Sequence, residues 1–127
     1  MRDISFRAWD KIRKIMYTGL PYSNAGSDGR DNFPQVLKHP MIYIVMQYTG
    51  LTDKNGVRIY EGDIIVAGNY KWKCKVVWDE KCARFIGLTN DKDVKLVYIG
   101  MSDKNNNSAV EVIGNIYENP ELLNTLN

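Results

Sequence analysis

The chain has 127 residues, of which 44% are hydrophobic and 25% are charged. This length and composition suit one globular domain and exclude a chain that is disordered throughout. The net charge of +2 is too close to balance to indicate nucleic-acid binding by itself. No apolar run reaches the length of about 20 residues that a membrane-spanning helix needs, and the first residues lack a signal-peptide core. We therefore expect a cytoplasmic protein with no membrane partner.

The N-terminal segment carries a strand pattern. Residues 3–9 place apolar side chains at every second position, which is typical of a half-buried strand. Asp10 and Lys11 then form a turn into a second strand at residues 12–17. The segment therefore predicts an N-terminal β-hairpin.

Residues 18–40 are rich in glycine, proline and small polar residues, which interrupt regular structure. Three alternatives stay open for this segment: it is mobile, it holds a turn of helix near residues 35–38, or it carries a binding function. The apolar run at residues 41–48 lies between Pro40 and Gly50. Its short length and its β-branched and aromatic residues predict a buried strand.

Turn residues divide the rest of the chain into short segments. Asn55-Gly56 is the strongest short hairpin signal in the chain, and Glu61-Gly62-Asp63 is a second turn. Asn119-Pro120 is typical of a helix start. The strands predicted between these signals cover residues 57–60, 64–67, 70–79, 83–88, 94–99 and 110–117.

Many short strands at this spacing predict a sandwich or a small barrel. The fold class that we expect is mainly β, with a small SH3-like barrel or pseudo-barrel, an N-terminal β-hairpin and a short C-terminal helix. We treat residues 1–127 as a single domain. Residues 1–56 hold the hairpin, the loop and a strand, and residues 57–127 hold the five-stranded barrel and the helix.

The predicted strand at residues 70–79 has two chemically different faces. Tyr70, Trp72, Cys74, Val76 and Trp78 alternate with Lys71, Lys73 and Lys75. Lysines two residues apart on a strand are about 7 Å apart and are able to contact a phosphate backbone. We favour a buried aromatic face with solvated lysines, and nucleic-acid contact through the three lysines is the alternative.

The two cysteines match neither a CxxC redox motif nor a zinc-binding spacing. In a hairpin of residues 70–78 and 82–88, Cys74 lies opposite residues 86–87 rather than opposite Cys82. We expect two buried or half-buried thiols that behave as small apolar side chains.

Residues for catalysis are scarce. His39 is the single histidine, and we expect it to be solvated, so a Ser–His or Cys–His pair is not supported. Glu61 with Asp63, and Asp79 with Glu80, are carboxylate pairs of the kind that binds magnesium or shares acid–base work, but acidic residues are also ordinary turn residues. We expect no enzyme, no cofactor and no metal site.

Three stretches resemble one known family. They are residues 4–10 with Met16, residues 46–65, and residues 112–123, which contain ISFRAWD, MQYTGLTDKNG with IYEGDII, and VIGNIYENPELL. Together they resemble the YopX proteins of phages and prophages. The resemblance implies a mainly β fold and a phage or prophage origin, hence a location in the host cell, and it implies no reaction, cofactor or catalytic residue.

Two hypotheses for function follow. The first is a non-enzymatic protein-interaction module that forms a homo-oligomer or binds a host or phage protein, using apolar surface at residues 41–48 and at Leu122, Leu123 and Leu126. The second is a nucleic-acid-binding barrel that uses Lys71, Lys73 and Lys75.

Overall fold

The computed structural model describes residues 3–19, 33–67, 72–90 and 96–124. The chain divides into two compact units, Met1–Tyr48 and Thr49–Asn127. Each unit contains its own cluster of buried apolar side chains.

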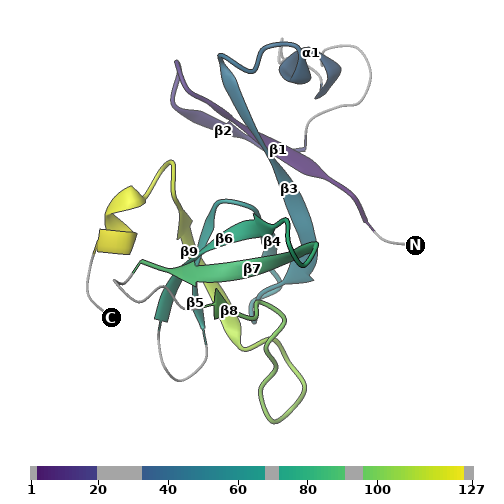
Figure 1. The fold of residues 1–127 in the computed structure, drawn as a ribbon, viewed down its shortest axis with the longest axis vertical. Helices are drawn as coiled ribbons and strands as arrows, with labels where there is room; N and C mark the ends of the chain where they lie inside the picture. The colour runs from purple at the N-terminus through teal and green to yellow at the C-terminus, as the bar shows by residue number, and fades with distance from the viewer. Residues whose placement is uncertain (1–2, 20–32, 68–71, 91–95, 125–127) are drawn as a thin grey trace. The chain divides into compact units, whose positions relative to one another are not determined.

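The first unit is built on an antiparallel hairpin (Figure 1). Strand β1 (Phe6–Asp10) pairs with β2 (Ile15–Tyr17) on one side and with the start of β3 (Tyr43–Thr52) on the other. The predicted N-terminal hairpin is therefore confirmed. Helix α1 (Phe33–Leu37) is a short turn of helix. It agrees with the alternative that residues 18–40 hold a turn of helix near residues 35–38. Residues 20–32 lie outside the described residues.

The first unit buries a small apolar cluster on one face of its sheet. Val36 of α1 packs with Ala8 of β1 and Tyr43 of β3. The half-buried side chains of Tyr17 and Val45 pack against these residues, together with Ile42. Alternation along β1 and β3 explains this, because Tyr17 and Val45 are both register partners of Ala8 and so share its face of the sheet.

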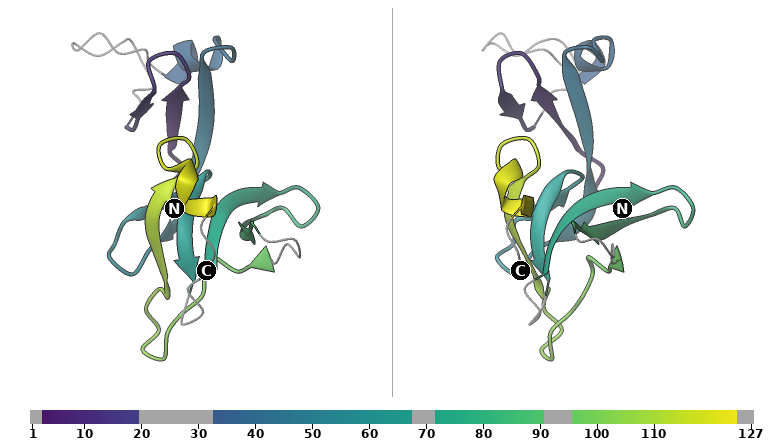
Figure 2. Two further views of the ribbon diagram at one scale, coloured as in Figure 1. Left: turned by 90° about the vertical axis from the view of Figure 1, so that its left-hand side faces the viewer. Right: turned by 60° about the vertical axis from the view of Figure 1, so that its left-hand side comes forward.

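The second unit contains most of the strands. They are β4 (Arg58–Tyr60), β5 (Asp63–Ala67), β6 (Trp72–Asp79), β7 (Arg84–Thr89), β8 (Leu96–Val97) and β9 (Val110–Asn115). Five of them form an antiparallel sheet in the order β8-β7-β6-β5-β9, and β4 lies beside β3 in the order β2-β1-β3-β4. The five-stranded sheet curls into a half-barrel (Figure 2). The predicted mainly β fold with a small pseudo-barrel is confirmed.

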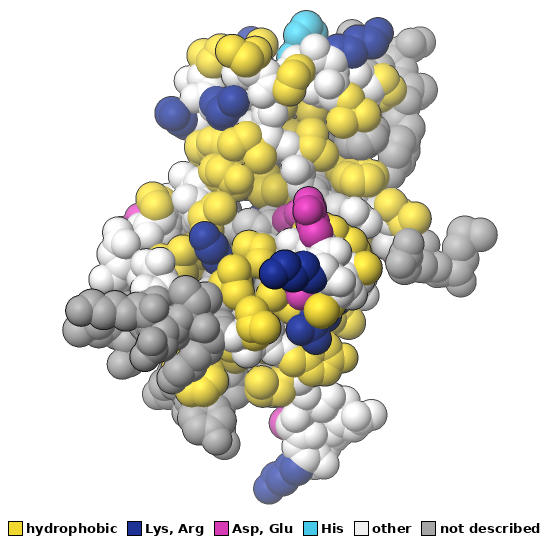
Figure 3. All heavy atoms as spheres, viewed as in Figure 1, with side chains coloured by type: hydrophobic (Ala, Val, Ile, Leu, Met, Phe, Trp, Pro, Cys, Tyr) yellow, Lys and Arg dark blue, Asp and Glu magenta, His cyan; other side chains and the backbone are white. Residues whose placement is uncertain are grey.

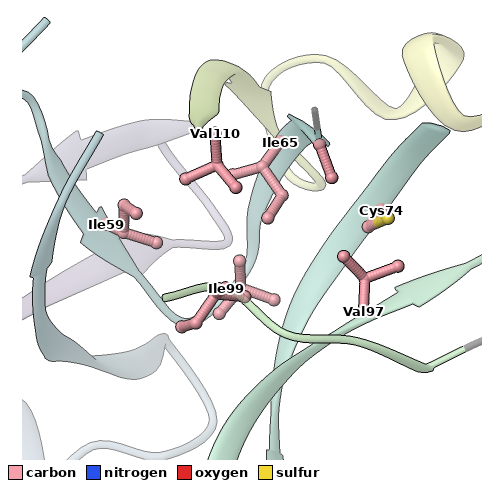
Figure 4. Close-up of a cluster of buried hydrophobic side chains, with 8 residues drawn as sticks. Ile59, Ile65, Cys74, Val97, Ile99 and Val110 are labelled. Carbon is pink, nitrogen blue, oxygen red and sulfur yellow. The ribbon is translucent and has the colours of Figure 1, made fainter. Parts of the chain in front are cut away.

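The core of the half-barrel lies on the inner face of this sheet (Figure 4). Cys74 and Val76 of β6 belong to it, and Lys73 and Lys75 alternate with them on the opposite face. The alternation predicted for this strand is confirmed over residues 72–76, whereas residues 70–71 lie outside the described residues. The buried members of this core are Ile59, Ile65, Ala67, Cys74, Val76, Val97, Ile99 and Val110.

One aromatic residue departs from the prediction. Trp72 packs against the core, but Trp78 is 44% exposed. Its ring meets the ring of Phe85 edge to face, with the centroids 4.9 Å apart. Trp78 is the second-last residue of β6, beside the connection to β7, so its ring packs on the edge of the core rather than within it.

The register of the hairpin between β6 and β7 also differs from the prediction. Cys74 lies opposite Thr89, because the last pair is Asp79 with Arg84 and four residues connect the strands. Ala83 in this loop has a φ of 51°. Cys74 is buried as expected, but Cys82 in the loop is exposed, and no disulfide joins them.

The C-terminal helix is confirmed as a short 3-10 helix, η2 (Pro120–Asn124), which contacts β6. Asn119 precedes it as predicted, and its carbonyl accepts the N–H of Leu122. The side chain of Asn119 turns back instead of capping the helix, since its Oδ1 accepts the N–H of Asn115 at 3.2 Å.

Candidate functional site

The lysines singled out in the sequence lie on β6. Lys73 is opposite Val66 of β5, and Lys75 is opposite Ile64 of β5 and Leu88 of β7. The strand thus brings both lysines to one face of the sheet, away from the core. Both are half-buried rather than fully exposed, and Lys71 lies outside the described residues.

The carboxylates considered as metal or acid–base groups serve turns. Asp63 is buried, and its Oδ2 accepts the N–H of Tyr60 at 2.8 Å across the Glu61-Gly62 turn. Gly62 has a φ of 84°, which glycine adopts easily. Asp79 accepts the N–H of Lys81 at 3.2 Å, and its Oδ2 lies 3.5 Å from Nε of Arg84. Each arrangement satisfies backbone or side-chain donors within its own hairpin.

Asp53 is a buried carboxylate just before the Asn55-Gly56 turn. Its Oδ1 accepts the N–H groups of Asn55 and Val57, and its Oδ2 accepts the N–H of Val112 on β9. Burial raises the pKa of Asp53, but these three hydrogen bonds and the nearby Lys54 outweigh it, so its pKa lies below the ordinary value of 3.8. Asp53 therefore joins the β3–β4 turn to the edge strand of the half-barrel.

A shallow polar groove borders this turn. It has a volume of about 580 Å³, and the Asn-rich loop before β9 forms its other wall. Oδ1 of Asp103 accepts the N–H groups of Asn105 and Asn107 and so fixes that loop. The lining residues are Thr52, Asp53, Lys54, Asp103, Asn106, Asn107, Ser108 and Ala109.

The turn between β1 and β2 exposes both charged and apolar side chains. Oδ1 of Asp10 accepts the N–H groups of Ile12 and Arg13, and Lys14 donates its N–H to the carbonyl of Asp10. Lys14 has a φ of 60°, so the turn closes through a left-handed residue. Ile12 is 71% exposed, and Ile15 is exposed as well.

A second segment lies directly beside this turn. The N–H of Lys11 donates to the carbonyl of Ile42 at 2.8 Å, and Nζ of Lys11 donates to the carbonyl of Pro40 at 3.3 Å. Residues 37–41 thereby adjoin residues 11–15. This segment adds the exposed side chains of Leu37 and of Met41, which is 85% exposed.

We name residues 11–15 and 37–41 the basic tip. It carries four exposed or half-exposed cations, four large exposed apolar side chains and the exposed side chain of His39. On the first unit, Lys and Arg side chains intermingle with hydrophobic ones (Figure 3). The cations are Lys11, Arg13, Lys14 and Lys38, and the apolar side chains are Ile12, Ile15, Leu37 and Met41.

The carboxylate beside the basic tip is engaged inside the turn. Asp10 is 2% exposed, and its Oδ2 lies 4.0 Å from Nε of Arg13. A hydrogen bond with Tyr17 and the charge of Asp10 raise the pKa of Arg13, which remains a cation. The tip therefore presents positive charge and aliphatic surface together.

Within the described residues, no group of three or more His, Cys, Asp and Glu side chains is placed to hold a metal ion. None of the helices in the described ranges is long and apolar enough to cross a membrane.

Comparisons with known proteins agree with the fold. The family model described as YopX protein matches residues 5–124. The chain belongs to the YopX family. The crystal structure of protein EF1440 from Enterococcus faecalis is similar to this YopX protein, with 31% sequence identity and a TM-score of 0.61. The match covers 97% of this chain and 99% of that one. No curated protein matches the sequence.

The sequence resemblance is thus confirmed, but sequence reasoning missed the basic tip of this YopX protein. The sequence pattern that could have indicated the tip is the interleaving of Lys and Arg with isoleucine at residues 11–15. Residues 37–40 fell within a segment without a clear pattern. Met41 was predicted to belong to a buried strand, but β3 begins at Tyr43 and Met41 is exposed. Only the pairing of β1 with β3 brings the two together, and that register is not visible in either segment alone.

Proposed function

We propose that this YopX protein is a non-enzymatic interaction module of a phage or prophage, and that it binds a host or phage protein through the basic tip. The observation that carries this proposal is the exposure of Met41 and Ile12, at 85% and 71%, beside Leu37 and Ile15 on adjoining segments. Single exposed apolar residues are common on protein surfaces, whereas a group of them is typical of a binding site.

The energetics support a protein partner. Burial of a large aliphatic side chain contributes about 1.5–3 kcal/mol, so a few such residues supply much of the free energy of a specific complex, from which the cost of association is subtracted. The tip is also held in place, since the carboxylate of Asp10 and the backbone of Lys11 fix the turn. A pre-organised surface loses less conformational entropy on binding.

Self-association through the apolar residues considered in the sequence has weaker support. Met41 at the start of the run at residues 41–48 is exposed and belongs to the basic tip, whereas Tyr43, Met46 and Tyr48 of that run are buried. Leu122 and Leu123 are half-buried. Leu126 lies outside the described residues. Less apolar surface is therefore offered there than at the basic tip.

Nucleic-acid binding through β6 also has weaker support. Lys73 and Lys75 are half-buried, and the aromatic rings on this strand belong to the opposite face of the sheet. Base stacking needs aromatic rings next to the cations. A titration with single-stranded and double-stranded DNA over a salt series tests this alternative. We expect the double variant Lys73→Glu with Lys75→Glu to leave any weak binding unchanged, and a large loss of salt-dependent binding would favour the nucleic-acid alternative instead.

Photo-crosslinking tests the proposed interaction. A photoreactive phenylalanine derivative replaces Met41 or Ile12 in the full-length protein, which is produced in cells that carry the phage genes. We expect a crosslink from both positions to the same protein, identified by mass spectrometry. The matched control replaces Val57, an exposed apolar residue of the second unit, and it is expected to give no such product.

Three results would contradict the proposal. They are no crosslinked protein from either tip position, the same products from Val57 as from Met41, and a product that contains only two copies of this chain. Light scattering of the purified protein separates the last result from a complex with another protein.

A further inference from the structure

We infer that the partner binds the basic tip through an acidic segment, in which carboxylates alternate with aliphatic side chains. This inference rests on the proposed function and adds the chemical class of the partner. It follows from the charge of the tip, from the type of its apolar residues and from the mixing of the two on the surface.

Among the residues that the structure describes, the charge of the tip is one-sided. Lys11, Arg13, Lys14 and Lys38 lie on adjoining segments, while Asp10 is almost fully buried and accepts hydrogen bonds from the turn. Four cations and one carboxylate give these residues a higher positive charge than the net charge of +2 of the whole chain. Positive charge is therefore concentrated here, and it attracts an anionic partner and repels a cationic one.

The apolar residues of the tip are aliphatic. Ile12, Ile15, Leu37 and Met41 are exposed, and none of them offers a ring on which a nucleic-acid base stacks. Single-stranded nucleic-acid sites combine cations with aromatic platforms. The imidazole of His39 is the one aromatic ring within residues 11–15 and 37–41, so the tip offers cations with a single small ring and no row of aromatic rings along which successive bases stack. This favours an acidic polypeptide over a nucleic acid.

The mixing of the two kinds of side chain on the surface argues against a lipid surface. Membrane-binding segments separate an apolar face from a cationic face, so that the apolar face enters the bilayer alone. On the face of the first unit seen in Figure 3, Lys and Arg side chains lie among hydrophobic side chains instead of on a separate face. Insertion of these aliphatic groups would bring ammonium groups toward the hydrocarbon region, whereas a segment with alternating acids and aliphatics matches both kinds of residue.

Fluorescence polarisation with the full-length protein tests this inference. The probe is a short labelled peptide rich in Glu and Asp with interspersed Leu. The comparison probes are the same peptide with Lys in place of the acids, a labelled single-stranded DNA, and vesicles of phosphatidylserine and phosphatidylcholine. We expect the acidic peptide to bind best, and we expect its affinity to fall as the salt concentration rises.

A charge-neutral tip variant provides the specific test. It combines Lys11→Gln, Lys14→Asn and Lys38→Gln, with asparagine chosen because it tolerates the left-handed backbone of residue 14. The matched control combines Lys75→Gln, Lys81→Gln and Lys104→Gln in the second unit and removes the same charge. We expect the tip variant to lose about tenfold or more in affinity for the acidic peptide, corresponding to about 1.4 kcal/mol, and the control to lose less than about twofold.

A second variant guards against misfolding of the first. Met41→Gln keeps all the charges and replaces an exposed residue, so its melting temperature is expected to stay close to that of the original protein. It is expected to weaken binding of the acidic peptide and to leave binding of a leucine-free acidic peptide unchanged.

Several outcomes would overturn the inference. One is an equal loss of affinity for the acidic peptide in the tip variant and its control. The others are binding of the lysine peptide, of the DNA or of the vesicles that is tighter than binding of the acidic peptide. The crosslinking experiment separates this failure from failure of the proposed function. If the tip still crosslinks one protein after its charges are removed, the interaction stands and the acidic partner is wrong.

Discussion

At the scale of single residues, Asp53 shows how one carboxylate holds two parts of the half-barrel together. It satisfies two N–H groups in its own turn and one N–H on β9, which is 59 residues away in the sequence. Val112 and Asp53 meet where β9 forms the edge of the sheet. The charge of Asp53 is therefore used for architecture, and no substrate is required to explain it.

Asp53→Asn is expected to lower the free energy of unfolding by about 1–3 kcal/mol, because an amide group replaces one acceptor oxygen and leaves a partly buried N–H without its partner. Urea unfolding at neutral pH measures this loss. Glu80→Gln, at an exposed turn position, is the control and is expected to be nearly neutral.

The same residue predicts a pH dependence. The pKa of Asp53 is lowered in the folded protein relative to 3.8, so its ionised form stabilises the fold. This contribution is fully present above the unfolded pKa and is lost as the pH falls through the lower folded pKa. We expect the stability difference between the original protein and Asp53→Asn to shrink below about pH 4. A difference that grows in acid would contradict this assignment.

At the scale of elements, the strands follow from local patterns, and the connections between them do not. Alternation placed β1 and β6 near their observed ranges, because a half-buried strand needs side chains of two kinds at every second position. Turn signals placed β9 near its observed range. The register of β6 with β7 was missed, since it depends on a four-residue loop with Ala83 in a left-handed conformation. Alanine gives no signal of this conformation, unlike the glycine of Asn55-Gly56.

The contact between β9 and the C-terminal 3-10 helix leads to a prediction. A methyl group on Gly114 would lie 2.6 Å from Oδ1 of Asn119 and 3.0 Å from its Cβ, so the Asn119 side chain would have to move. We expect Gly114→Ala to lower the free energy of unfolding by about 1–3 kcal/mol and to loosen the hydrogen bond from Asn115 to Asn119.

A double-mutant cycle checks the cause of that loss. Asn119→Ala removes Oδ1 and Cγ, the two nearest obstructing atoms, together with the hydrogen bond to Asn115, and keeps the Cβ. If the clash explains the cost, Gly114→Ala should cost less in the Asn119→Ala background than alone. Equal costs in the two backgrounds would point instead to the backbone of Gly114.

At the scale of the whole molecule, charge distribution matters more than net charge. The total of +2 gave no sign of a binding surface, because it sums positions that are far apart in the sequence. Residues 11–15 and 37–41 became one surface only through the pairing of β1 with β3. This part of the candidate site was therefore outside the reach of composition and of local motifs.

Uneven charge predicts chromatographic behaviour. We expect the protein to bind a cation exchanger at neutral pH and low salt more strongly than its net charge suggests, because the basic tip presents several cations together. The charge-neutral tip variant should elute at clearly lower salt than the matched lysine variant of the second unit, although both have the same net charge. Elution of the two variants at the same salt concentration would show that the basic tip does not dominate binding to the cation exchanger.

The thioether of Met41 has a chemical consequence of its own. An exposed methionine sulfur is readily oxidised to the sulfoxide, which is polar and is restored only by a reductase. With 85% of Met41 exposed, peroxide treatment is expected to modify this position before the buried Met46. Oxidised protein would then keep its fold and lose part of the aliphatic surface, so peroxide formed during purification would weaken the proposed binding of the partner to the basic tip.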